Sequence, residues 1–163
     1  MKIQFRHALI LAMFAAAFSM PPSQAADSPS PPPPKPKPED KQLEAARAAI
    51  AKQDWTGAQG ILRDALAANA ANADYHNLYA YSMRKAGGAD MGVVFKHYNE
   101  ALRLDAKHRG AHEYVGEAYL LVGNVGKAKE HLKVLDGLCR FGCAEYTDLK
   151  KAIAEFESKQ ASK

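Results

Sequence analysis

Residues 110–135 read GAHEYVGEAYLLVGNVGKAKEHLKVL, and this stretch decides the fold. Apolar residues recur in it at steps of three and four, which is the spacing of amphipathic helices. In the second half these positions are Val125, Ala128, Leu132 and Leu135. Gly123-Asn124 interrupts the pattern and signals a turn. The stretch therefore predicts two helices joined by a short connection.

Related patterns occur twice upstream, at a spacing close to 34 residues. The equivalent positions Ala58, Val94 and Ala128 lie 36 and 34 residues apart. A period in this range is typical of stacked helical repeats, in which no unit buries its apolar face alone. Proline is absent beyond residue 40, as long helices require. We predict an all-α fold with helices at 40–52, 55–69, 74–86, 90–104, 110–122, 125–138 and 145–158.

The hairpin at 110–135 resembles the tetratricopeptide repeat (TPR) family. The residues that match the family's signature are Val115-Gly116, Tyr119, Gly123, Ala128 and Leu132. Small residues at Gly116 and Ala128 would let the two helices of the hairpin approach closely. Larger side chains at Tyr119 and Leu132 would fill the space beside them.

The other two units depart from this signature. The second unit keeps the frame but carries a two-residue expansion at 88–90. The first unit, at about 39–72, is degenerate, with Trp55 and Ala58 as its best matches. The resemblance covers about 39–142. It implies a right-handed α-α superhelix of about three hairpins over 40–160, closed by a C-terminal capping helix.

The resemblance also implies a function, because the first helices of such hairpins line a concave groove that holds another protein or a peptide segment. By the family's frame, the groove contacts are Asn77, Tyr81, Arg84, Lys85, Glu113, Glu117 and Arg47. The alternative is that these are ordinary solvated helix residues. The basic clamp with which some members hold C-terminal carboxylates is not reproduced, since Gly110 and Tyr114 replace its basic groups. We predict a non-enzymatic scaffold or adaptor.

Cys139 and Cys143 form a second candidate site. Residues four apart in a continuous helix have Cβ atoms about 5–6 Å apart, whereas a disulfide needs about 3.8 Å. A bond therefore requires the helix to end between them, which Gly142 permits. We predict a structural disulfide that fixes the last helix to the preceding hairpin. The alternative is an exported assembly factor whose thiol pair carries a soft metal ion such as Cu(I), or serves in redox chemistry.

The histidines offer a weaker signal. His108 and His112 are four residues apart, a spacing that can bind zinc on one helix face. However, His76 and His112 are equivalent in successive repeats, as are His97 and His131. Repetition at equivalent positions favours a packing role, so we predict no metal site and no cofactor. No nucleophile elbow, phosphate loop or metalloprotease motif is present, and we predict no enzymatic activity.

The first 39 residues have the composition of targeting and linking segments. Residues 1–25 match a secretory signal peptide, with Lys2 and Arg6 ahead of a short apolar run. Residues 26–39 match a Pro-rich disordered linker. Without Lys2 and Arg6, 20 basic residues face 18 acidic ones, and this near-balance argues against a nucleic-acid partner. We expect an exported, periplasmic protein without stable membrane insertion after cleavage; self-association through exposed repeat faces is a further alternative.

Overall fold

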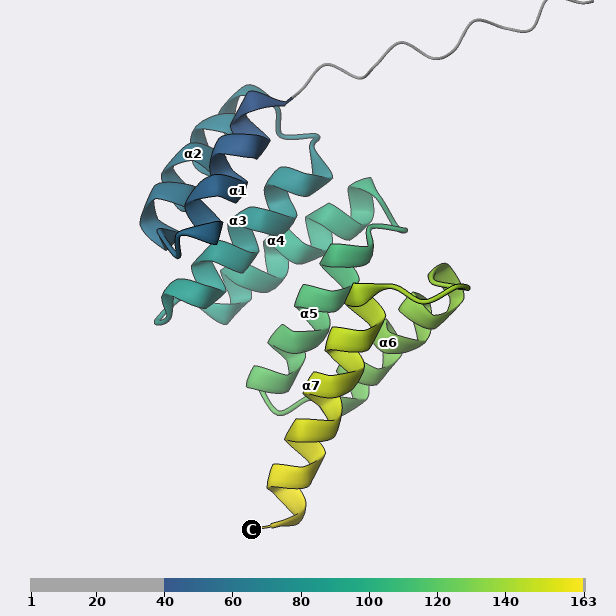
Figure 1. Cartoon of the computed structure of the whole chain (residues 1–163). Coiled ribbons are helices and arrows are strands. Elements are labelled where there is room, and N and C mark those ends of the chain that lie inside the picture. Colours follow the sequence, from purple (N-terminus) through teal and green to yellow (C-terminus); the bar gives the residue numbers. More distant parts are fainter. Residues whose placement is uncertain (1–39, 163) are drawn as a thin grey trace, which may run out of the picture. The chain divides into compact units, whose positions relative to one another are not determined.

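The computed structural model describes residues 40–162, which form seven α-helices and no strand (Figure 1). The helices are α1 (Lys41–Ala51), α2 (Trp55–Ala68), α3 (Ala73–Ala86), α4 (Met91–Leu104), α5 (Arg109–Leu121), α6 (Val125–Leu138) and α7 (Ala144–Ala161). The predicted helix ends are confirmed to within one residue, except that α7 continues three residues beyond 158. The predicted signal peptide and linker lie outside the described residues.

Each helix begins at a side chain that accepts a hydrogen bond from the backbone of its first turn. Five of these caps are Asp or Asn: Asp40, Asp54, Asn72, Asp90 and Asn124. They satisfy N–H groups that have no partner within the helix. The other two caps are less common residue types: His108 Nδ1 accepts from Ala111 N at 3.1 Å, and Cys143 Sγ accepts from Tyr146 N at 3.4 Å. A capping side chain directly before each helix therefore defines where that helix begins.

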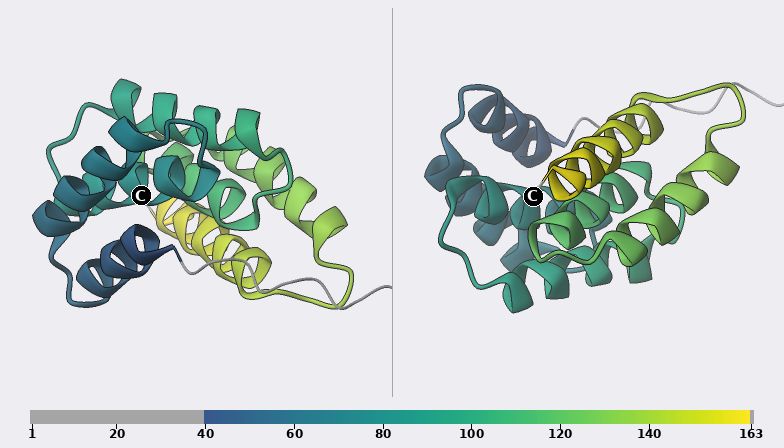
Figure 2. Two further views of the ribbon diagram at one scale, coloured as in Figure 1. Left: turned by 90° about the horizontal axis from the view of Figure 1, so that it is seen from above. Right: turned by 90° about the horizontal axis from the view of Figure 1, so that it is seen from below.

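The helices pair as antiparallel hairpins, α1 with α2, α3 with α4, and α5 with α6. The first helix of each hairpin packs beside the first helix of the next, and α7 continues this row by packing against α5. In both end-on views of Figure 2, α1 and α7 lie on one side of the helical body and α4 on the opposite side. No helix in this part of the chain is long and apolar enough to cross a membrane.

The core follows the period that the sequence predicts. The second-helix positions that are buried are Ala58, Leu62, Ala65, Val94, Tyr98, Ala101, Ala128 and Leu135. Small residues bring the helices close together, and Tyr98 and Leu62, both fully buried, fill the space between them. The two-residue expansion of the second unit falls partly in the turn after α3 and partly in α3 itself, which has 14 residues against 13 in α5.

Gly116 has a different partner from the one expected. A Cβ atom at this position would lie 2.6 Å from Cδ2 of Leu149, a fully buried side chain of α7. The three nearest atoms all belong to Leu149 of α7, whereas we expected Gly116 to make room for α6. Its missing side chain admits α7 instead, and this contact places the last helix in the row of first helices.

Candidate partner-binding groove

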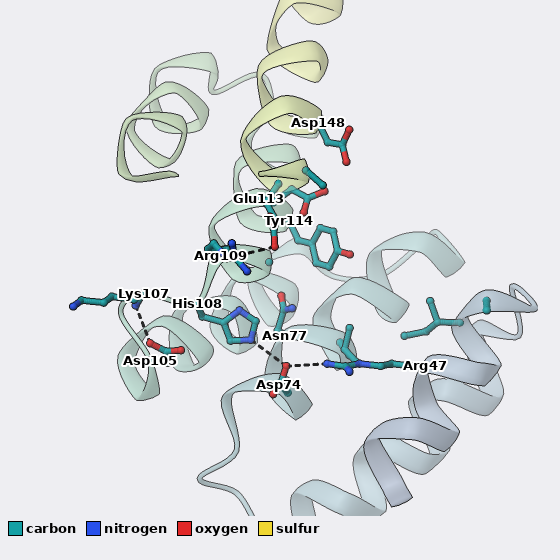
Figure 3. Close-up of a pocket in the computed structure, with 16 residues that line it drawn as sticks. Arg47, Asp74, Asn77, Asp105, Lys107, His108, Arg109, Glu113, Tyr114 and Asp148 are labelled. Atoms are coloured by element: carbon teal, nitrogen blue, oxygen red, sulfur yellow. Dashed lines mark hydrogen bonds and ion pairs between the residues drawn. The ribbon is translucent and has the colours of Figure 1, made fainter. Parts of the chain in front are cut away.

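The row of first helices carries a hollow of about 820 Å³ (Figure 3). Side chains of α3 and α5 form its centre, while α1 and the first turns of α7 contribute the two sides. The lining residues are Arg47, Ile50, Ala51, Asp74, Asn77, Leu78, Asp105, Lys107, His108, Arg109, Gly110, Glu113, Tyr114, Ala144, Glu145 and Asp148. We call this hollow the central pocket. Three predicted contacts, Arg47, Asn77 and Glu113, line it.

Ion pairs cross the central pocket from helix to helix. Asp74 Oδ1 lies 3.4 Å from the Arg47 guanidinium and 3.4 Å from His108 Nε2, so α1, α3 and the start of α5 meet at one carboxylate. Arg109 Nε lies 3.6 Å from Oε1 of Glu145, which joins α5 to α7. Both guanidinium groups on the pocket wall are thus already opposite a carboxylate.

Two polar side chains in the pocket centre are buried without such partners. Asn77 is 3% exposed, and its Oδ1 accepts no hydrogen bond from the described residues. Glu113 is 9% exposed. Its burial, followed by the nearby carboxylates of Glu117, Asp148 and Glu145, raises the pKa of Glu113 to about 8. The Glu113 carboxyl is therefore largely protonated at neutral pH.

Tyr81 and Lys85 line a neighbouring hollow of about 550 Å³, together with Trp55. The Tyr81 ring contacts Trp55 edge-on, with centroids 6.0 Å apart, and lies 4.4 Å from the Tyr114 ring. The Lys85 ammonium sits 6.0 Å from the Tyr81 ring centroid, within the range of a cation–π contact. These rings form a continuous aromatic row from α2 across α3 to α5.

Arg84 and Glu117 pair with each other. The Arg84 side chain is 7% exposed, its Nη2 donates to Glu117 Oε2 at 2.6 Å, and its Nε donates to the Tyr98 hydroxyl at 3.3 Å. The two residues line a third hollow, of about 260 Å³, against α7. The prediction of Arg84 as a groove contact needs correction, because its buried guanidinium already binds Glu117 and Tyr98 within the fold. Glu117, with 28% of its side chain exposed, is partly accessible.

The repeated histidines pair within each hairpin. His76 Nδ1 lies 2.9 Å from His97 Nδ1, and His112 Nδ1 lies 2.9 Å from His131 Nδ1. In each pair the first-helix ring also donates Nε2–H to a backbone carbonyl, of Ala70 at 3.0 Å or Ala106 at 3.1 Å. The neutral first-helix ring must then accept at Nδ1 from its partner. These contacts match the packing role predicted for the histidines.

No group of three or more candidate metal ligands occurs within residues 40–162. His108 and His112 do not form a shared metal site, because His108 caps α5 and His112 pairs with His131.

The structure contains the predicted disulfide bond between Cys139 and Cys143, with Cα atoms 5.6 Å apart. As expected, α6 ends before Cys139, and Gly142 lies in the left-handed region at φ +85°.

Sequence reasoning missed the part that α7 plays in the pocket. Asn77, Glu113 and Asp148 are each the fifth residue of their helix, in α3, α5 and α7 respectively. All three line the central pocket. The signal was present in the sequence, since aligning α7 with the first helices of the repeats would have placed Asp148 beside Glu113. We expected α7 to serve only as a capping helix and therefore did not place Asp148 in the pocket.

Solved structures with similar folds support the repeat assignment, whereas no protein-family model and no curated protein sequence matches this chain. The type III secretion translocator chaperone SycD of Yersinia enterocolitica is 13% identical, with a TM-score of 0.62 over 74% of this chain and 92% of its own. The TPR domain of Arabidopsis OM64 is 18% identical, with a TM-score of 0.61 over 71% of this chain and 93% of its own. The CopN–Scc3 complex contains a chain that is 16% identical, with a TM-score of 0.55 over 82% of this chain and 91% of its own. Residues 40–162 thus have the all-α helical-hairpin repeat fold of tetratricopeptide repeat domains.

Proposed function

We propose that this chain is an exported adaptor that binds a partner protein on the concave row formed by α1, α3, α5 and α7. The observation that carries the proposal is the central pocket, an open hollow of about 820 Å³ to which all four helices contribute. The adjoining aromatic row of Trp55, Tyr81 and Tyr114 extends this surface. Tyr and Trp are enriched among the residues that dominate binding energy at protein interfaces.

Similar folds are consistent with this function. SycD is described as a translocator chaperone, and the CopN–Scc3 structure is that of a complex.

Export is supported by the sequence of residues 1–25, which match a secretory signal peptide. Cleavage after Ala25 would give a protein beginning at Ala26, and intact-mass measurement of the protein recovered from the exported fraction tests this. A mass that includes residues 1–25 would contradict it.

Affinity capture from the native exported compartment tests the binding surface. The variant should combine Tyr81→Ala with Lys85→Ala, since replacing the buried Arg84 would disturb the fold. A matched control is Val93→Ala with Lys96→Ala, two exposed positions on α4. We expect the first variant to lose the captured protein and the control to retain it, with unchanged circular dichroism in both. Equal capture by both variants would contradict the assignment of this surface.

A further inference from the structure

Asn77 carries an acceptor that the fold leaves unused. Gly110 leaves room for its amide, because a Cβ atom at position 110 would lie 3.3 Å from Asn77 Nδ2. Its Oδ1 is buried in the pocket wall and has no hydrogen-bond partner among the described residues. A buried polar group without a hydrogen-bond partner destabilises the folded state. A donor that reached this oxygen would remove the destabilisation.

The neighbours of Asn77 are also acceptors rather than donors. Glu113 and Asp148 stand at the equivalent fifth positions of α5 and α7, and neither forms a hydrogen bond or ion pair with another described residue. Arg47 and Arg109 already face other carboxylates. In Figure 3 the Lys107 side chain points away from the other labelled pocket residues. The pocket therefore offers an amide oxygen and a carboxyl group at its centre and a second carboxyl group at its α7 side, and the cation that acts on Glu113, Arg84, is itself paired with Glu117.

This arrangement fits a positively charged donor. A neutral amide N–H from a partner backbone would satisfy Asn77 alone and leave the carboxyl groups crowded. A cation would satisfy Asn77 and also stabilise the ionised form of Glu113, whose pKa is now raised by burial and, to a smaller extent, by the neighbouring carboxylates. Apolar and aromatic side chains, including Ile50, Leu78 and Tyr114, line other parts of the pocket and could contact an aliphatic stem.

We propose that the central pocket binds the ammonium group of a lysine side chain on the partner polypeptide, through Asn77 Oδ1 and the carboxylates of Glu113 and Asp148. This inference rests on the proposed adaptor function and names the chemistry that the groove recognises. The three acceptors come from three different helices, α3, α5 and α7. An ammonium group carries three donors on a rotatable stem and can meet such acceptors, whereas the planar fork of arginine matches a single carboxylate best.

The test is a titration of the folded protein, followed by NMR, with a short peptide that is capped at both ends and contains one lysine. Its twin carries acetyl-lysine, which has the same stem without the charge. We expect the lysine peptide to shift the side-chain amide signals of Asn77 and the backbone amide of Gly110, and the acetylated twin to leave them in place. Glu113→Gln should weaken binding roughly tenfold, the loss of one charge-assisted hydrogen bond.

Two further variants separate loss of binding from loss of folding and from a general loss of negative charge. Asp148→Asn lies at an exposed position, so it should fold normally and still weaken binding. Glu44→Gln removes the same charge from an exposed position outside the pocket and should bind like the unchanged protein. Calorimetry at pH 7 in buffers of different ionisation enthalpy should detect proton release on binding, because Glu113 must ionise beside the ammonium.

Several outcomes would overturn the inference. If the acetylated twin shifts Asn77 equally, the pocket binds neutral peptide, so the lysine assignment fails while the adaptor function stands. An arginine twin that binds at least as tightly would contradict the choice of lysine. Equal binding by Glu113→Gln and Glu44→Gln would show unspecific attraction to surface carboxylates. If neither peptide shifts the pocket and the Tyr81 and Lys85 variant still captures its partner, both proposals fail.

Discussion

Neighbouring residues on the concave side have different roles. Arg84 and Lys85 adjoin on α3, yet Arg84 is held inside the fold by Glu117 and Tyr98 while Lys85 remains exposed. Helical periodicity predicts the face on which a residue lies. It does not predict how a long side chain bends, or that a carboxylate 33 residues away will meet it. The position of Arg84 could be predicted from the sequence, and its burial could not.

Replacing Arg84 should destabilise the fold. Arg84→Ala removes the cation opposite Glu117 and leaves the Tyr98 hydroxyl without its donor. We expect a loss of about 2–3 kcal/mol in the free energy of unfolding, less than for a fully buried pair because Glu117 retains some contact with water. Urea denaturation followed by circular dichroism measures it. Arg103→Ala, which removes an exposed pair with Glu100, is the control and should barely move the midpoint.

Glu113 should make stability depend on pH. Its pKa is raised from 4.5 to about 8 in the folded state, first by burial and then by the carboxylates around it. The folded protein therefore retains a proton that the unfolded chain loses, so its stability falls as the pH rises from 4.5 to 8. Glu113→Gln should remove this dependence and stabilise the protein at pH 8 by on the order of 2 kcal/mol, discounted because the carboxyl faces an open pocket. Equal effects of the substitution at pH 4.5 and pH 8 would contradict the raised pKa.

Individual helices were the most predictable feature, because apolar spacing and turn residues are local signals. The bounds of α6 match the prediction at both ends, and the other helices differ by at most one residue at each end, except that α7 continues three residues beyond 158. Which helices contact one another is a long-range property that periodicity does not contain. That is why the sequence paired Gly116 with α6, whereas the structure pairs it with Leu149 of α7. The same limitation hid the contribution of Asp148 to the central pocket.

The packing of α7 against α5, and with it the stability of the fold, should be sensitive to the size of residue 116. Gly116→Ala places a methyl group against the fully buried Leu149, and overpacking of this kind costs about 1–3 kcal/mol. Gly60→Ala is a matched control inside α2, where a Cβ atom meets nothing within 4 Å. The control should stabilise the protein by roughly 0.5–1 kcal/mol through its better helix propensity. Stabilisation by both substitutions would show that α7 is not packed tightly on Gly116.

The bond between Cys139 and Cys143 should fasten the start of α7. Replacing both with Ser opens a five-residue loop, for which chain entropy predicts a loss of about 2 kcal/mol. Faster hydrogen exchange in the first turn of α7 should accompany it. Intact-mass measurement with an alkylating reagent, with and without reductant, separates this role from a reactive thiol pair. Alkylation without reductant, or a bound metal ion in stoichiometric amount, would favour the carrier alternative.

The whole molecule produces a surface that no single hairpin has. The central pocket draws residues from α1, α3, α5 and α7, which span the described chain from Arg47 to Asp148. Repeat stacking aligns equivalent positions of successive helices, so residues far apart in sequence come to line one concave surface. Within residues 40–162, the second helices supply eight of the 17 buried hydrophobic residues, and α1, α3, α5 and α7 supply the other nine as well as most of the pocket lining.

Site-specific photo-crosslinking in the native exported compartment tests this central claim most directly. A photoreactive amino acid is placed at Arg47 or Lys85 on the concave side, or at Val93 on α4, all of them exposed positions. We predict that the two concave positions form a crosslink to the same partner protein and that position 93 does not. Crosslinks to that partner from position 93, with none from positions 47 and 85, would contradict the assignment of the concave row as the binding surface.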